Sequence, residues 1–350
     1  MRVLVTGAAG RVGANMVRRL VAAGADVKAM VLPGDPLRSK LAAFPDIEVV
    51  EADLGDQPAI DAACKNVTHV VHLAAQLIRG DTPVDRFYDV NAFGTLRLLE
   101  GVVKAGGPLE RFVLASSDGT YRPGAPPAVP LTEDAPQEPA DYYGTGKLLG
   151  ELILRNHAAQ YDIPFSITRF ATVVSPEEVG DMFRLGFWRR VLSWQGLGKD
   201  CHIWQLFDGQ PNLVTIFDTQ AGDAPSDTAV GLTGPDGTPW TLSILDVRDA
   251  VDGLYLALTE PEAVGQAFNL AAARPTPHDE GATVIADAYG VPKLMIELPM
   301  AHHLELDIRR ARTLLGFEPR YDFALTAQSA VDQQRSSEIS NYVPVRPYPR

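Results

Sequence analysis

Hydrophobic positions in the first half of the chain alternate between short apolar runs and amphipathic stretches. Residues 1–5 are apolar and β-branched, and the stretch after them carries one apolar helix face before a glycine stop at Gly24. That face consists of Val12, Met16, Val17, Leu20 and Val21. The same alternation predicts strands at 26–31, 47–51, 67–73, 111–115 and 165–169, and helices at 56–66, 83–105 and 142–160. Strands separated by helices of this length predict an α/β fold with a parallel sheet and right-handed crossovers.

The alternation fails after about residue 175. Residues 176–240 mix aromatic residues with Gly- and Pro-rich loops, and a strand pattern returns only weakly at 242–247, before a helix around 249–258. A chain of 350 residues also exceeds the usual size of one core. We expect a first domain over 1–175, to which segments around 242–270 return, a second domain mainly over 176–335, and a loosely held tail at 336–350.

Composition narrows the classes of partner. The formal charge of −13 argues against binding to nucleic acids or anionic membranes, both of which need a basic surface. No apolar run approaches the length of a bilayer span, and no signal-peptide pattern precedes the first strand. Cys64 and Cys201 stand far apart in no metal-binding spacing. These features predict a cytoplasmic enzyme with a small-molecule substrate and no metal.

The segment Thr6-Gly7-Ala8-Ala9-Gly10-Arg11-Val12-Gly13 joins the first strand to the first helix. A glycine-rich turn in this context predicts a dinucleotide site, because glycines allow a tight turn, close approach of a pyrophosphate and close packing of helix on strand. The start of the helix then offers free N–H groups to the phosphates.

A second group of signals predicts hydroxyl–carbonyl chemistry. Ser117 ends the fifth strand, and Tyr143 and Lys147 open the next helix one turn apart. A lysine ammonium near the phenol lowers its pKa, so that Tyr143 is a plausible general acid and base. Ser117 would bind the same substrate oxygen.

With these motifs in register, the chain resembles the extended short-chain dehydrogenase/reductases, the NAD-dependent epimerase/dehydratase group. The resemblance spans about residues 1–320 and rests on Thr-Gly-x-x-Gly-x-x-Gly, Asp53-Leu54, His-Leu-Ala-Ala, Ser-Ser-x-x-x-Tyr and Tyr-x-x-x-Lys, with later echoes such as Val247-Arg248-Asp249. It implies a Rossmann-type doubly wound parallel sheet with a smaller C-terminal substrate domain.

The resemblance also implies roles for residues at the motif positions. Ser117, Tyr143 and Lys147 would be catalytic, and Asn91 would support a water relay unless local backbone bonds satisfy it. Asn91, Tyr143 and Lys147 would also contact the cofactor, Lys147 through the nicotinamide ribose. The remaining cofactor-binding residues would be Gly7, Ala9, Gly10, Arg11, Val12, Gly13, Asp53, Leu54, Leu73, Ala74 and Ala75.

Two departures from the family pattern bear on the ligands. At the end of the second strand, Val31 and Leu32 stand where an acid would bind a ribose hydroxyl or an arginine a 2′-phosphate. Asp35 suits a ribose and Arg38 or Lys40 a phosphate, and the missing arginine favours NAD without excluding NADP. Ala171-Thr172 and Leu242 replace an asparagine and an arginine of the nucleotide-sugar enzymes, which argues against a nucleotide sugar.

Substrate residues are predicted at the strand end and in the aromatic region. They are Ser117, Asp118, Tyr143, Arg184 and Trp188. Asp118 resembles the acid of the family's dehydratases, but Gly119 replaces the glutamate that follows it there, and an Asp-Gly turn explains the pair as well. The aromatic residues of 183–207 form either a pocket wall or the core of the second domain.

The leading interpretation is an NAD(P)-dependent oxidoreductase that interconverts a secondary alcohol and a carbonyl by hydride transfer. The alternative is a sugar or nucleotide-sugar epimerase or dehydratase that retains NAD, and a third, less favoured hypothesis is a non-catalytic dinucleotide sensor. Apolar positions on helices 83–105 and 142–160 exceed what one sheet-facing stripe needs, which favours a homodimer. They include Leu96, Leu99, Val102, Val103, Leu148, Leu149, Leu152 and Ile153.

Overall fold

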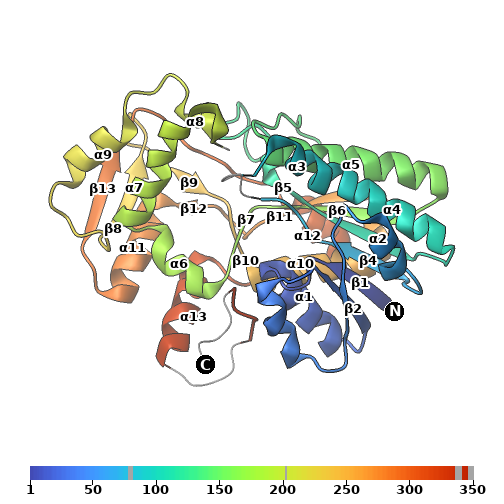
Figure 1. The fold of residues 1–350 in the computed structure, drawn as a ribbon. Coiled ribbons are helices and arrows are strands. Elements are labelled where there is room, and N and C mark those ends of the chain that lie inside the picture. Colours follow the sequence, from blue (N-terminus) through green and yellow to red (C-terminus); the bar gives the residue numbers. More distant parts are fainter. Residues whose placement is uncertain (78–81, 202, 336–340, 346–350) are drawn as a thin grey trace.

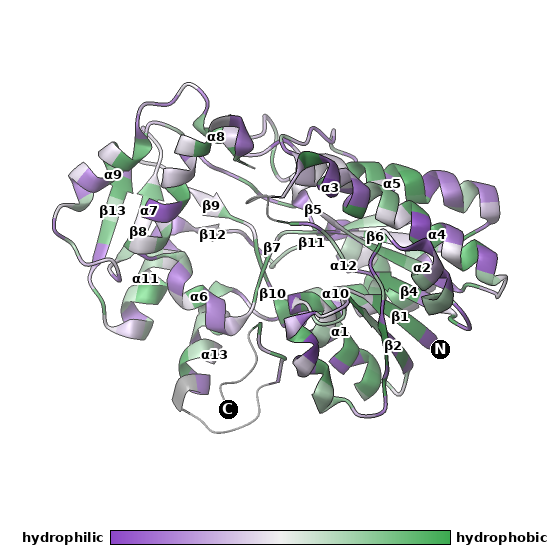
Figure 2. Cartoon of the chain, viewed as in Figure 1, coloured by the Kyte–Doolittle hydropathy of each residue, from purple (hydrophilic) through white to green (hydrophobic). Residues whose placement is uncertain are grey.

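A seven-stranded parallel sheet organises most of the chain in the computed structural model, which describes residues 1–77, 82–201, 203–335 and 341–345 (Figure 1). Its strand order is β11-β6-β5-β4-β1-β2-β3. The strands are β1 (Arg2–Thr6), β2 (Asp26–Val31), β3 (Glu48–Glu51), β4 (His69–His72), β5 (Arg111–Ser117), β6 (Phe165–Phe170) and β11 (Gln266–Leu270). Figure 2 shows β1 and β2 as mainly hydrophobic, in keeping with strands that are covered on both faces.

Helices cover both faces of this sheet. One face carries α1 (Arg11–Ala22), α10 (Val247–Thr259) and α12 (Arg309–Leu315), which share a hydrophobic core with the strands. The other face carries α2 (Gln57–Ala63), α4 (Gly94–Ala105) and α5 (Tyr142–Tyr161), with a separate core of their own. This is the Rossmann-type doubly wound arrangement that the sequence predicted.

The strand order reverses direction next to β1. From β1 the chain adds β2 and β3 on one side, and then returns to add β4, β5 and β6 on the other. The carboxyl ends of β1 and β4 therefore flank a topological switch point, the position at which open α/β sheets bind their ligands. The glycine-rich turn follows β1 at this point.

The predicted helix at 83–105 is interrupted. It consists of α3 (Val84–Tyr88), a π-helical turn at Asp89–Phe93, and α4. Short 3-10 segments lie elsewhere in the chain, at Pro36–Ala43, Asp118–Thr120, Trp194–Asp200 and Pro261–Ala263. Such short departures from α-helix follow local hydrogen bonding that hydrophobic periodicity does not report.

The region after residue 175 forms most of a second body, on the left of Figure 1. Its helices are α6 (Pro176–Met182), α7 (Leu185–Ser193), α8 (Trp204–Phe207), α9 (Leu213–Ala221), α11 (His278–Tyr289) and α13 (Phe323–Arg335). Its strands are β8 (Ala229–Thr233), β9 (Thr241–Leu242), β12 (Thr276–Pro277) and β13 (Lys293–Glu297), and β7 (Thr172–Val174) pairs with β10 (Ile244–Asp246) beside it. Two further hydrophobic clusters hold this region together.

Residues 341–345 differ from the expectation of a loosely held tail. The side chain of Asn15 on α1 donates to the carbonyl of Val343 at 2.9 Å and accepts from its N–H at 2.7 Å. The N–H of Val345 donates to Glu177 on α6 at 2.5 Å, and the Tyr342 side chain is buried. The rest of the predicted tail, 336–340 and 346–350, lies outside the described residues.

Candidate functional site

The glycine-rich turn is closely packed except at its centre. Gly7 has a φ of +63°, and a Cβ there would lie 2.9 Å from the backbone nitrogen of Ala74, just after β4. A Cβ on Gly13 would lie 2.1 Å from the carbonyl oxygen of Gly7. At Gly10, the residue that precedes α1, the same oxygen lies 3.1 Å away and no other contact within 4 Å is found. Two of the glycines thus allow close packing, and the third leaves space.

This geometry fits a dinucleotide pyrophosphate. No side chain caps the N-terminus of α1, so its first N–H groups have no side-chain acceptor and are available to an anion beside Gly10. The side chain of Arg11 turns away to pair with Glu178 of α6 at 2.5 Å. A contribution of Arg11 to phosphate binding would therefore come from its backbone.

Both cations near the end of β2 have partners within the chain. Arg38 pairs with Glu51. Lys40 is buried and donates to the carbonyls of Gly10 at 3.5 Å and Val345 at 3.2 Å. Burial lowers the pKa of Lys40, against the attraction of Asp35 and other nearby acids. Neither side chain is arranged as a free receptor for a 2′-phosphate.

The ends of β3 and β4 border the same space. Asp53 follows β3, accepts from the N–H of Gly55 at 2.7 Å and pairs with Arg86 at 2.9 Å. Partial burial opposes ionisation of Asp53, but these two partners lower its pKa overall. After β4, the hydroxyl of Thr6 accepts from the N–H groups of Leu73 and Ala74, both at 3.1 Å. Thr6 thereby ties the loop containing Ala75 to the end of β1.

Asn91 lies in the π-helical turn and is satisfied by backbone. Its side-chain nitrogen donates to the carbonyl of Gln76 at 3.0 Å, and its side-chain oxygen accepts from the N–H of Gln76 at 2.9 Å. These two bonds anchor the loop after β4 to the helix beside α5. The structure therefore favours the backbone role for Asn91 over a water relay.

The structure brings Ser117, Tyr143 and Lys147 together at the carboxyl end of β5. The Lys147 ammonium is buried, donates to the carbonyl of Ala115 at 2.7 Å and lies 5.9 Å from the centre of the Tyr143 ring. Burial lowers the pKa of Lys147 to about 8, while the charge of Glu151 acts against this decrease. Burial also raises the pKa of Tyr143, and a hydrogen bond with Ser117 opposes that rise.

Close backbone contact explains how these groups meet. A Cβ on Gly144 would lie 2.0 Å from the carbonyl oxygen of Gly119, so glycine is needed where the start of α5 packs against the turn after β5. Gly119 and Gly144 were not among the site residues predicted from the sequence. The signal was the Gly-x-Gly pattern directly after Tyr143: Gly144 packs against Gly119, and Gly146 packs on another face of α5 against Asn91.

Asp118 lies next to this group. Ser117 donates to its carboxyl at 3.0 Å and accepts from the N–H of Gly119 at 3.0 Å. Loss of hydration raises the pKa of Asp118 to about 6, against the stabilising hydrogen bonds from Ser117 and Gly119. The Asp-Gly turn and an acidic group beside Ser117 are thus both present.

The structure gives packing roles to the two predicted substrate residues of the second body. Arg184 donates to the carbonyls of Gly180 at 2.6 Å and Asp227 at 2.7 Å, and it stacks on Tyr289. Trp188 is buried in an aromatic cluster, and the centre of its ring lies 4.9 Å from that of His278 and 6.0 Å from that of Trp240. We therefore leave Arg184 and Trp188 out of the site.

The described residues contain neither a metal-binding cluster nor a helix that could span a membrane. No group of three or more His, Cys, Asp or Glu side chains in this part of the chain is placed to hold a metal ion. Within the same ranges, no helix is both long enough and apolar enough to cross a membrane.

The site defines a class of dinucleotide-binding enzyme. In this class a glycine-rich turn lies at the switch point of a doubly wound sheet, with a serine, a tyrosine and a lysine gathered at a nearby strand end. The model of the NAD dependent epimerase/dehydratase family matches residues 3–271. The chain belongs to this family.

Relatives over the full length support the assignment. A UDP-glucose 4-epimerase of Mycolicibacterium smegmatis is 32% identical over 342 residues, which cover 93% of this chain and 95% of that protein. Another UDP-glucose 4-epimerase, from Rhizobium meliloti, is 28% identical over 94% of this chain and 95% of its own length. A short-chain dehydrogenase/reductase superfamily protein of Agrobacterium tumefaciens, solved with bound NAD, is 30% identical, with a TM-score of 0.81 over 96% of this chain and 97% of that one.

Proposed function

We propose that this protein is an NAD-dependent epimerase that oxidises one hydroxyl of a sugar and then reduces the ketone from its other face. The observation that carries the proposal is the match over nearly the whole chain to UDP-glucose 4-epimerases. It shifts the balance from the leading sequence interpretation, a net alcohol oxidoreductase, to the alternative of an epimerase. Stereochemistry changes in such a reaction while the cofactor returns to its starting state.

The cofactor in this proposal is NAD, held along the carboxyl ends of β1, β3 and β4. Gly7, Gly10 and Gly13 would surround the pyrophosphate, with backbone from Ala9, Arg11 and Val12. Asp53 and Leu54 would contact the adenine, and Leu73, Ala74 and Ala75 would line the remaining path. The support is the loose packing at Gly10, where a Cβ would meet only the carbonyl oxygen of Gly7, together with the uncapped start of α1 and the internal partners of Arg38 and Lys40.

Bound NAD would accept and return the hydride. Tyr143 would take the proton of the substrate hydroxyl and later return it, because its phenol lies beside Ser117 at the strand end. Ser117 would hydrogen-bond to the same oxygen as charge develops on it. Lys147 would supply the positive charge that makes the Tyr143 phenolate accessible, and it is already oriented by the carbonyl of Ala115.

The two parts of the chain have different roles in this proposal. We propose that residues 1–175, together with segments around 242–270, bind the cofactor and that 176–335 mainly shape the substrate site. A second candidate, net dehydrogenation of a simpler alcohol, is favoured by the replacements at Thr172 and Leu242. A cytoplasmic location is part of this proposal, since Cys64 and Cys201 are both free.

The test is an assay of purified protein with UDP-glucose and NAD. We expect conversion to the C4 epimer without net formation of reduced cofactor, whereas a dehydrogenase would reduce NAD stoichiometrically. Tyr143→Phe should lower turnover by far more than tenfold, the equivalent of ~1.4 kcal/mol. Tyr142→Phe, in which a half-buried neighbour keeps its ring, is the matched control. Turnover by Tyr143→Phe within tenfold of wild type would contradict the assignment.

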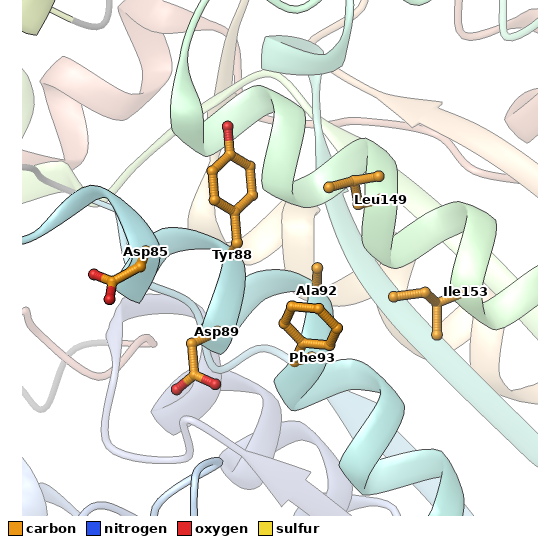
Figure 3. Close-up of a pocket in the computed structure, with 7 residues that line it drawn as sticks. All are labelled: Asp85, Tyr88, Asp89, Ala92, Phe93, Leu149 and Ile153. Carbon is orange, nitrogen blue, oxygen red and sulfur yellow. The ribbon is translucent and has the colours of Figure 1, made fainter.

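We also propose a homodimer through α3, α4 and α5. A shallow surface pocket of about 660 Å³ lies between α3, the π-helical turn and α5 and is lined mainly by apolar side chains, including Phe93, Leu149 and Ile153 (Figure 3). Phe93 is 52% exposed and Leu152 is 55% exposed. The predicted interface changes in one respect: Leu99 and Val102 are buried within the chain, so Phe93, Leu149 and Leu152 are the residues that would meet a partner.

A further inference from the structure

One buried carboxylate below the site takes no part in the proposed chemistry. Glu151 lies on α5, is 1% exposed, and follows Lys147 by four residues and Tyr143 by eight. Residues at this spacing share one helix face. The face that carries the tyrosine and the lysine therefore continues into Glu151.

Glu151 is fully engaged by neighbouring elements. It accepts from Ser116 at 2.5 Å and from Gln137 at 3.3 Å, and Arg169 of β6 donates to its two oxygens at 3.0 and 2.7 Å. Arg169 in turn donates to the hydroxyl of Tyr121 at 2.8 Å and to a backbone carbonyl at 2.8 Å. A buried ion pair with this many bonds holds its elements in one relative position.

The bonds of α5 fall on consecutive residues at the end of β5. Lys147 holds the carbonyl of Ala115, Glu151 holds the side chain of Ser116, and Tyr143 interacts with Ser117. A shift of α5 along the strand would break all three together. Glu151 thus determines where the tyrosine and the lysine lie relative to Ser117.

We propose that Glu151 is a positioning residue that acts through Lys147, holding α5 in register with the end of β5 and keeping the lysine positively charged. The second effect follows from Coulomb attraction between a carboxylate and an ammonium on adjacent helix turns. This inference rests on the proposed function, because it concerns the role of Lys147 in that reaction.

None of the other groups described near Lys147 supplies the negative charge that would keep its ammonium protonated. His72 on β4 is buried, and burial lowers its pKa to about 3, so that it adds no charge at neutral pH. Tyr143, on the same helix, is neutral until it ionises. Asp118 acts on Tyr143, and Arg169 is held by its ion pair with Glu151 on the side of that carboxylate. Burial lowers the pKa of Lys147, and the charge of Glu151 raises it.

The experiment is the pH profile of kcat for Glu151→Gln, with UDP-glucose and NAD. If the substitution lowers the pKa of Lys147 by about one from its value of about 8, kcat at pH 8 falls about fivefold relative to wild type and hardly changes at pH 6. The substrate KM should stay the same. Glu151→Asp, which keeps the charge, should restore the profile.

Ser116→Ala separates the two effects, because it removes the bond by which Glu151 holds the end of β5 and leaves the carboxylate, so that kcat should fall by the same factor at every pH. Its profile should keep the wild-type shape. If Glu151→Gln does not fold, the double variant Glu151→Gln with Arg169→Met avoids an unpaired buried charge and takes its place.

The outcomes separate the two proposals. If the pH profile of Glu151→Gln superimposes on that of the wild type while Lys147→Met is inactive, this inference alone is overturned. Unchanged turnover in Lys147→Met and in Tyr143→Phe overturns the proposed function instead.

Discussion

Gly13→Ala tests the packing of the glycine-rich turn. The new Cβ would lie 2.1 Å from the carbonyl oxygen of Gly7 and 2.9 Å from the Cα of Ala8. Both neighbours are backbone atoms, so neither can swing aside as a flexible side chain would. We therefore expect either the turn or the start of α1 to move.

The size of the effect follows from the cost of overpacking. Inserting a methyl group into a closely packed site costs about 1–3 kcal/mol. For domains of about 150–250 residues, each kcal/mol lowers Tm by about 2–4 °C, so the variant should melt about 2 to 12 °C below wild type. Displacement of the turn should also weaken NAD binding, because the N–H groups of α1 would no longer point to the same place.

Gly10→Ala is the control. Its Cβ would meet the carbonyl oxygen of Gly7 at 3.1 Å and nothing else within 4 Å, so the fold should absorb it with a small change in Tm. The methyl group would still occupy the space proposed for the pyrophosphate, and NAD affinity should fall. Thermal unfolding and calorimetric titration with NAD measure the two effects separately. A Gly13→Ala protein with wild-type Tm and wild-type affinity would refute the packing argument.

Three other predictions concern the rest of the molecule. Leu152→Arg should convert the dimer to monomers at unchanged Tm, as measured by light scattering, whereas Leu99→Arg should unfold the protein because Leu99 is 0% exposed. If Leu152→Arg keeps the molar mass of the wild-type assembly in solution, this interface is excluded. Asn15→Ala removes both hydrogen bonds to Val343 and should lower Tm and speed the release of NAD, which stopped-flow measurements follow. Release rates identical to those of wild type would show that residues 341–345 do not stabilise the cofactor site. The folded-state pKa of Asp118, about 6, lies above its usual value of 3.8. The stability that this group contributes is therefore present below pH 3.8 and is lost as the pH rises through 6. The Tm of Asp118→Asn relative to that of wild type should rise over this range, and a constant difference would contradict the prediction.

Local signals were sufficient for the elements with strong periodicity. The first strand and helix, the glycine-rich turn between them and the tyrosine–lysine spacing on α5 were all predicted close to where they lie, because each depends on neighbours within a few residues. The helix at 83–105 was predicted as one piece, since the apolar stripe runs through the π-helical turn without a visible break. The aromatic residues of 183–207 could not be assigned from sequence, and the structure places Trp188 in a core.

The sequence by itself determined the class of fold and the identity of the residues at the end of β5. Spacing and residue type express those features within a single turn, strand or helix. Only the tertiary structure decided that Leu99 faces inward, that Asn15 binds Val343 and that Glu151 meets Arg169. These contacts join residues far apart in the chain, and the free energy of each depends on burial and on partners that no local pattern specifies.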